Sequence, residues 1–227
     1  MRFGVEGKKI FIVALIIIAF LITNACGQSQ EQKMKMFDAH EEKARNYRIK
    51  GNYQAALQEQ LKAVELNPEN AGSQIILGNI YIELEQWDKA IETLQQANKP
   101  GAKDERGFYL LALALEGKGE KEKAIESLQR AIKITPDDTL FLAKLAYLYD
   151  EIGNKKMAKE TYNRVLTIDP EYVSAVYNLA TIEEEDNRER AITLFKKSIE
   201  LEPNNEERVK RARKRIEELE RKKNTNP

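Results

Sequence analysis

The chain has 227 residues, with 37 basic and 37 acidic side chains, a single cysteine and a single histidine. Balanced charge gives no general electrostatic attraction to nucleic acid, so we expect no nucleic-acid partner. One cysteine and one histidine exclude an intramolecular disulfide and a zinc site of the usual ligand number, and they complete no catalytic dyad. The composition therefore predicts no enzyme, no metal site and no cofactor.

Residues 1–25 have the pattern of an export signal. Arg2, Lys8 and Lys9 precede an uninterrupted apolar run from Ile10 to Ile22. This run is shorter than the roughly 20 residues that cross a bilayer comfortably. The only cysteine, Cys26, follows just after the run, which resembles the lipobox of bacterial lipoproteins. The resemblance implies cleavage before Cys26 and acylation of its sulfur.

Two other forms of the N-terminus stay open. Thr23 and Asn24 depart from the leucine and small residue that the lipobox prefers, and Thr23 with Ala25 also fits ordinary signal cleavage. We expect a lipid-anchored protein of the bacterial cell envelope, on its periplasmic or extracellular face. The alternatives are an uncleaved inner-membrane anchor and a soluble secreted protein. Residues 26–36 lack apolar periodicity and predict a flexible tether.

From residue 37 the sequence repeats every 34 residues, giving units 37–70, 71–104, 105–138, 139–172 and a shorter 173–205. Small residues at fixed helical spacing mark places where two helices lie too close for a larger side chain. Pro100 and Gly101 come early in the second unit and predict a shortened second helix there. The eighth position holds Ala44, Gly78, Ala112, Ala146 and Ala180, and the twentieth holds Ala56, Ala90, Ala124, Ala158 and Ala191.

These columns resemble the tetratricopeptide repeat. The fourth unit matches its pattern with Leu145, Ala146, Tyr149, Ala158 and Pro170. The resemblance implies an all-α fold, a right-handed α-solenoid of about five helix pairs, which stacks neighbouring units and leaves a long surface for binding. Residues 206–223 are charged apart from a narrow apolar stripe, which predicts a helix capping the last repeat. Residues 224–227 are expected to be disordered.

In this family the first helix of each unit lines a concave groove, so the resemblance also implies a site for a protein or peptide partner. Position 12 or 13, or both, is acidic in four successive units, which favours a partner with a basic segment. The alternative is that the groove tyrosines fill the core between repeats. The predicted groove residues are Ile75, Asn79, Glu83, Arg106, Tyr109, Glu116, Tyr147, Asp150, Glu151, Tyr177, Glu184 and Glu185.

The sequence thus predicts an adaptor or assembly factor of the bacterial envelope, attached to a membrane through an N-terminal lipid or anchor. Two alternatives remain. The chain could be a structural repeat lipoprotein that self-associates as a homo-oligomer, or a repeat protein held by an uncleaved N-terminal helix.

Overall fold

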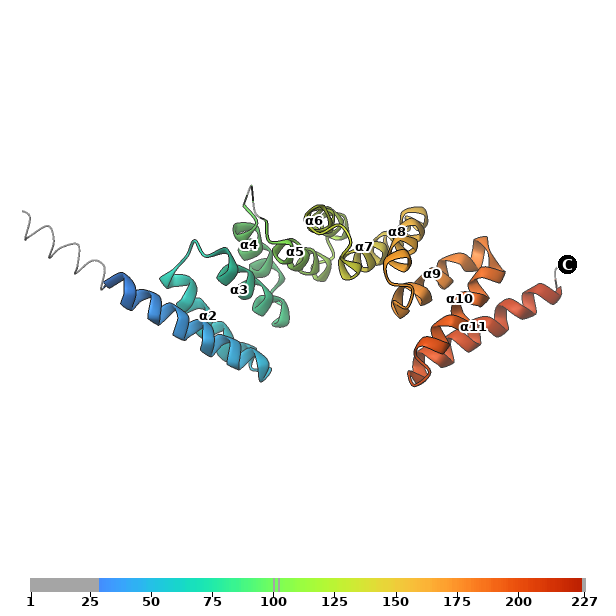
Figure 1. Cartoon of the computed structure of the whole chain (residues 1–227), viewed down its shortest axis with the longest axis horizontal. Coiled ribbons are helices and arrows are strands. Elements are labelled where there is room, and N and C mark those ends of the chain that lie inside the picture. Colours follow the sequence, from blue (N-terminus) through green and yellow to red (C-terminus); the bar gives the residue numbers. More distant parts are fainter. Residues whose placement is uncertain (1–28, 100, 102, 226–227) are drawn as a thin grey trace, which may run out of the picture. The chain divides into compact units, whose positions relative to one another are not determined.

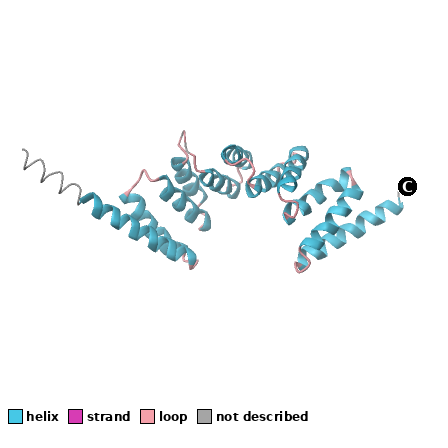
Figure 2. Cartoon of the chain, viewed as in Figure 1, coloured by secondary structure: helices cyan, strands magenta, loops and turns pink. Residues whose placement is uncertain are grey.

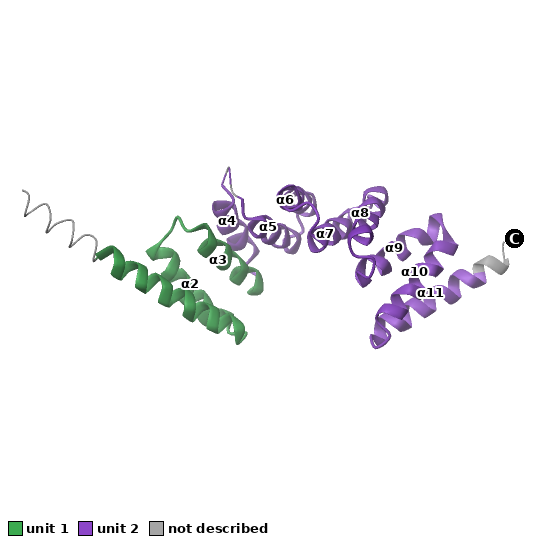
Figure 3. Cartoon of the chain, in the orientation of Figure 1, with its two compact units in different colours: residues 1–84 green, residues 85–227 purple. Residues whose placement is uncertain are grey.

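The computed structural model describes residues 29–99, 101 and 103–225. Every regular element within these residues is a helix, which confirms the predicted all-α fold (Figure 2). The described helices include none that is long and apolar enough to cross a membrane. The predicted export signal and Cys26 lie outside the described residues. The chain forms two compact units, Met1–Leu84 and Glu85–Pro227 (Figure 3).

The first unit contains a helix over residues 29–49, followed by α2 (Tyr53–Leu66) and α3 (Ala71–Glu83). Ala44 of the first helix and Ala56 of α2 are completely buried. The Gln60 side chain of α2 donates a buried hydrogen bond of 3.0 Å to the Ser73 carbonyl of α3. Short side chains and this buried bond let the helices of the unit lie close together.

Residues 29–36 are helical, whereas the sequence analysis expected a flexible tether there. The segment contains neither glycine nor proline, and Glu31 and Lys35 form an ion pair of 2.6 Å across one turn. Extending an existing helix avoids the cost of nucleating a new one. This part of the helix has no apolar stripe because its side chains are exposed up to Phe37, which is buried.

The second unit consists of paired helices (Figure 1). It begins with α4 (Trp87–Ala97), which has 11 residues, as the early proline predicts. Then α5 (Glu105–Gly117) packs on α6 (Lys121–Ile134), α7 (Thr139–Glu151) on α8 (Lys155–Ile168), and α9 (Val173–Asp186) on α10 (Arg188–Leu201). Successive pairs touch through α4 with α5, α6 with α7 and α8 with α9.

The small-residue columns lie at these helix contacts. Ala124 and Ala158 at position 20 have no exposed surface, and neither have Ala112 and Ala146 at position 8. Each alanine leaves room for the facing helix, where a larger side chain would force the pair apart.

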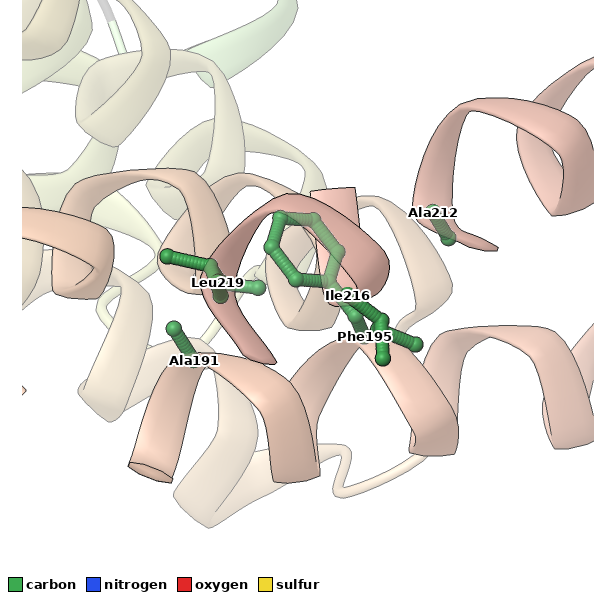
Figure 4. Close-up of a cluster of buried hydrophobic side chains, with 6 residues drawn as sticks. Ala191, Phe195, Ala212, Ile216 and Leu219 are labelled. Atoms are coloured by element: carbon green, nitrogen blue, oxygen red, sulfur yellow. The ribbon is translucent and has the colours of Figure 1, made fainter. Parts of the chain in front are cut away.

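The last helix, α11 (Glu206–Thr225), covers the end of the array. Its Ala212, Ile216 and Leu219 are buried in a cluster with Ala191 and Phe195 of α10 (Figure 4). The helix includes residues 224 and 225, where disorder was expected. The reason is again that an established helix propagates at little cost through residues of modest helix propensity.

Candidate functional site

One inter-repeat contact recurs through the array and involves half of the predicted acidic row. Position 17 of one repeat meets position 13 of the next. Lys121 bonds Glu151 at 2.8 Å and Lys155 bonds Glu185 at 2.6 Å, each pair 30 residues apart. In the first unit the hydroxyl of Tyr53 bonds the carboxylate of Glu83, which raises the pKa of that phenol.

The same contact has an apolar form between the second and third repeats. The ring of Trp87 lies against Gly117, so closely that a Cβ on this glycine would come 2.7 Å from two ring carbons. Position 13 is therefore a stacking contact between neighbouring repeats. Glu83, Glu151 and Glu185 belong to this contact, and their assignment to a free acidic groove edge is corrected.

Of the three acidic residues at position 12, two form ion pairs within the described chain and one, Asp150, does not. Glu116 of α5 forms an ion pair of 2.6 Å with Lys144 of α7, and Glu184 of α9 pairs with Arg215 of the capping helix. Asp150 is half-buried, and among the described residues its carboxylate has neither an ion pair nor a hydrogen bond. Burial raises the pKa of Asp150 above its ordinary value, because the charged form loses hydration.

One predicted groove residue lies in the core, and a second is partly covered by it. Ile75 is only 5% exposed within the first unit. Tyr177 packs against the buried cluster under α11, with its ring edge-on to Phe195 at 5.4 Å between centroids. The assignment of Ile75 to the exposed groove is therefore corrected, since positional spacing alone does not separate the two sides of a first helix. Tyr177 is half-buried, and its place in the groove stays a prediction.

The other predicted residues remain at or near the surface. Arg106 is exposed and bonds Asp104 just before α5, at 2.7 Å. Tyr109 is half-buried and its ring stacks on Phe141 of α7 at 5.1 Å. Asn79 of α3 is half-buried in the first unit.

Tyr147 lines a depression of about 260 Å³ on the second unit, here called the tyrosine depression. Leu140 and Tyr147 remain 47% and 38% exposed and lie together in this one hollow. The Asn178 amide donates a 3.0 Å hydrogen bond to the hydroxyl of Tyr162 and holds that buried ring in place. The lining comprises Leu140, Ala143, Lys144 and Tyr147 of α7, Tyr162 of α8, and Tyr172, Ser174 and Asn178 at the start of α9.

Tyr172 is not among the predicted groove residues, although its position in the repeat carries a signal. The last position of each repeat is the N-cap of the next first helix. Asn70, Asp104 and Asp138 occupy it, and each accepts a hydrogen bond from a backbone N–H of the helix that follows. Tyr172 takes this place before α9 and makes no such bond. Loss of a cap usually costs about 0.5–2 kcal/mol, so the tyrosine is not there for helix stability.

The depression is a largely aromatic and apolar surface that includes one cation, Lys144, and has carboxylates nearby. Burial raises the pKa of the Tyr147 and Tyr172 phenols, so both rings stay protonated at neutral pH. The described part of the chain contains no group of three or more His, Cys, Asp or Glu side chains arranged to hold a metal ion. Such a surface can bind by stacking, apolar burial and polar contacts.

Two family models match the chain, and both describe the tetratricopeptide repeat. One covers residues 47–114, and the other covers 105–138 and 141–172. The chain is a tetratricopeptide repeat protein, as these matches and the paired helices show. Proteins of this class are typically non-enzymatic scaffolds for protein–protein interaction.

Solved structures of similar shape include a MamA protein, with 26% sequence identity and a TM-score of 0.67, covering 76% of this chain and 95% of that one. YrrB, described as a TPR protein with an unusual peptide-binding site, has 23% identity and a TM-score of 0.67, covering 84% and 97%. PilF of Pseudomonas aeruginosa has 18% identity and a TM-score of 0.69, covering 83% and 90%. The last two likenesses concern the fold alone.

Among curated proteins, a mitochondrial pentatricopeptide repeat-containing protein of Arabidopsis thaliana is 38% identical over 61 residues. The match takes in 27% of this chain and spans only 8% of the relative's length.

The contact between Trp87 and Gly117 gives a test of the inter-repeat stacking. An alanine in place of a helical glycine ordinarily stabilises by up to roughly 1 kcal/mol. Here the added methyl would overlap the indole, so we expect Gly117→Ala to lower the free energy of unfolding by about 1–3 kcal/mol. Urea unfolding followed by circular dichroism measures the change. In a Trp87→Leu background the same substitution should be neutral or stabilising. A Gly117→Ala protein more stable than its parent would contradict the contact.

Proposed function

We propose that this protein is an adaptor or assembly factor of the bacterial cell envelope that holds a segment of a partner protein in the tyrosine depression. The observation that carries the proposal is the place of Tyr172. At this N-cap position a tyrosine replaces the usual capping Asn or Asp, and it lines the depression. Leu140 and Tyr147, which line the same depression, are also partly exposed. Exposed apolar groups gathered in one hollow are typical of interaction sites.

The partner is proposed to be a protein segment because of the depression's size and chemistry. A hollow of about 260 Å³ holds one or two side chains, and its rings offer flat apolar faces. The solved structure of YrrB, whose fold is similar, is described as having a peptide-binding site, which supports the same use of a tetratricopeptide scaffold.

The envelope location rests on the N-terminal sequence. Arg2, Lys8 and Lys9 before a short apolar run, with Cys26 just after it, support export and lipid attachment. A lipid at Cys26 would keep the repeats at a membrane surface, where the protein would gather or deliver envelope proteins. An uncleaved N-terminal anchor would give the same placement without the lipid.

Self-association remains the second candidate function, and the array ends do not favour it. Positions 7 and 10 are apolar and buried in the later repeats, as with Leu145 and Leu148. In the first repeat they are Lys43 and Asn46, both exposed. At the other end, the outward side chains of α11 include Lys210 and Arg213. These polar faces resist end-to-end stacking, because it would strip them of water.

The binding site can be tested by photo-crosslinking in cells. We expect the full chain carrying a benzoylphenylalanine at Leu140 to form an adduct with a different protein after irradiation. The matched control carries the same group at Glu160, an exposed residue of α8 outside the depression. An adduct with a second copy of this chain would support self-association instead. Equal adducts at both positions, or none at Leu140, would overturn the proposed site.

The membrane attachment has a separate test. Mass spectrometry of the protein from the membrane fraction should find a diacyl- or triacyl-modified Cys26 at the N-terminus. A Cys26→Ala variant should keep its full N-terminal segment or appear outside the membrane fraction. Recovery of mature protein that begins at Met1 would exclude the lipoprotein form in favour of an anchor.

A further inference from the structure

Asp150 stands beside the tyrosine depression without a cationic partner. It follows Tyr147 by three residues on α7, so the two side chains lie on one face of the helix. Its charge also acts on the phenol of Tyr162, which lines the depression. The carboxylate is half-buried and, among the described residues, has no ion pair or hydrogen bond. The Lys155 ammonium acts on it only from a distance and is itself paired with Glu185 at 2.6 Å.

The neighbouring acids differ from Asp150 because the protein neutralises them itself. Glu151 receives the Lys121 ammonium at 2.8 Å and Glu116 receives the Lys144 ammonium at 2.6 Å. A partner would have to displace these lysines before it used either carboxylate. Asp150 requires no such exchange, and a half-buried carboxylate without a partner gains most from a cation that arrives from outside.

The surrounding groups favour a cation over an anion. Asp138 and Asp169 both act on the phenol of Tyr172 from nearby, and Lys144 is offset by Glu116. The ring of Tyr147 already has a cation over it, since the Lys144 ammonium lies 5.2 Å from the ring centroid. Tyrosine faces next to an open carboxylate suit a group that is planar, cationic and weakly hydrated. Guanidinium has these properties, whereas ammonium is compact and strongly hydrated.

We propose that the tyrosine depression receives an arginine side chain of the partner segment, with its guanidinium stacked on the tyrosine rings and paired with Asp150. This inference rests on the proposed function, since it names the chemistry of the segment that the depression binds. One carboxylate, Asp150, then supplies the attraction for a basic segment that the sequence predicts for the whole acidic row.

Peptide display on the full chain tests the inference without a known partner. A library of random peptides on phage is selected against the parent protein in detergent, and the enriched peptides are sequenced. We expect arginine far above its library frequency. Binding of a labelled enriched peptide should weaken about tenfold or more when citrulline, its neutral isostere, replaces arginine, and to a smaller extent with lysine, because a charge-assisted hydrogen bond is lost or impaired.

Variants of the protein locate the interaction. Asp150→Asn should weaken the arginine peptide about tenfold and leave the citrulline peptide almost unchanged. The matched control Glu151→Gln removes a neighbouring carboxylate that Lys121 already occupies, and it should change affinity by less than about twofold. Lys144→Gln should strengthen binding, because it removes a competing cation and frees Glu116. An acidic ligand would instead bind more weakly to the Lys144→Gln protein.

The outcomes separate this inference from the proposed function. Enriched peptides without arginine, lysine peptides that bind as well as arginine peptides, or full binding by Asp150→Asn would each overturn the arginine assignment. In those cases peptide binding as such would stand. If no peptide is enriched above an uncoated surface, both the arginine assignment and the peptide-binding function are overturned.

Discussion

The structure depends on how closely neighbouring helices can approach. Ala124, Ala146 and Ala158 sit at contacts with no exposed surface, and each is small enough to let the facing helix lie against the backbone. A single helix pair cannot bury its apolar side chains alone, so each repeat completes its core on the next one. The capping helix α11 does the same for the last repeat through Ile216 and Leu219. The end of the core is thereby closed by a mostly charged helix.

This stacking also decides which side chains are available for function. Where position 17 of one repeat meets position 13 of the next, the acids at position 13 become structural partners of Lys121, Lys155 and Tyr53. Trp87 on Gly117 shows that the contact does not require charge. Among the surfaces that stacking leaves open in the second unit is the side of α7 that carries Leu140 and Tyr147, with Tyr172 beside it and half-buried Asp150 on the same helix. The proposed binding site, the tyrosine depression, lies on surface that the stacking of repeats leaves exposed.

The repeat period was sufficient to predict the helices, their order and the small contact residues, because these follow from spacing within one unit. The absence of an ion pair at Asp150, among the described residues, was harder to predict. Glu151 and Asp150 are adjacent in sequence and alike in charge, and only the position of Lys121, 30 residues away, distinguishes them. Tyr109 and Tyr177 occupy the same column, yet the first packs on Phe141 of α7 and the second on the cluster beneath α11, which spacing within a unit does not distinguish. Tyr172 lay outside the family's groove positions, although its column of Asn and Asp caps marked it as an exception.

Amide hydrogen exchange of the full chain, alone and with the segment it captures, tests the central claim most directly. The account predicts slower exchange over α7 and the start of α9, where the tyrosine depression lies, and unchanged exchange over α6, α10 and the outer surface of α11. Local opening of a helix becomes rarer when a ligand bridges its side chains, so protection should follow the contact surface. Protection confined to α6, α10 or α11, with α7 exchanging as in the free protein, would contradict it.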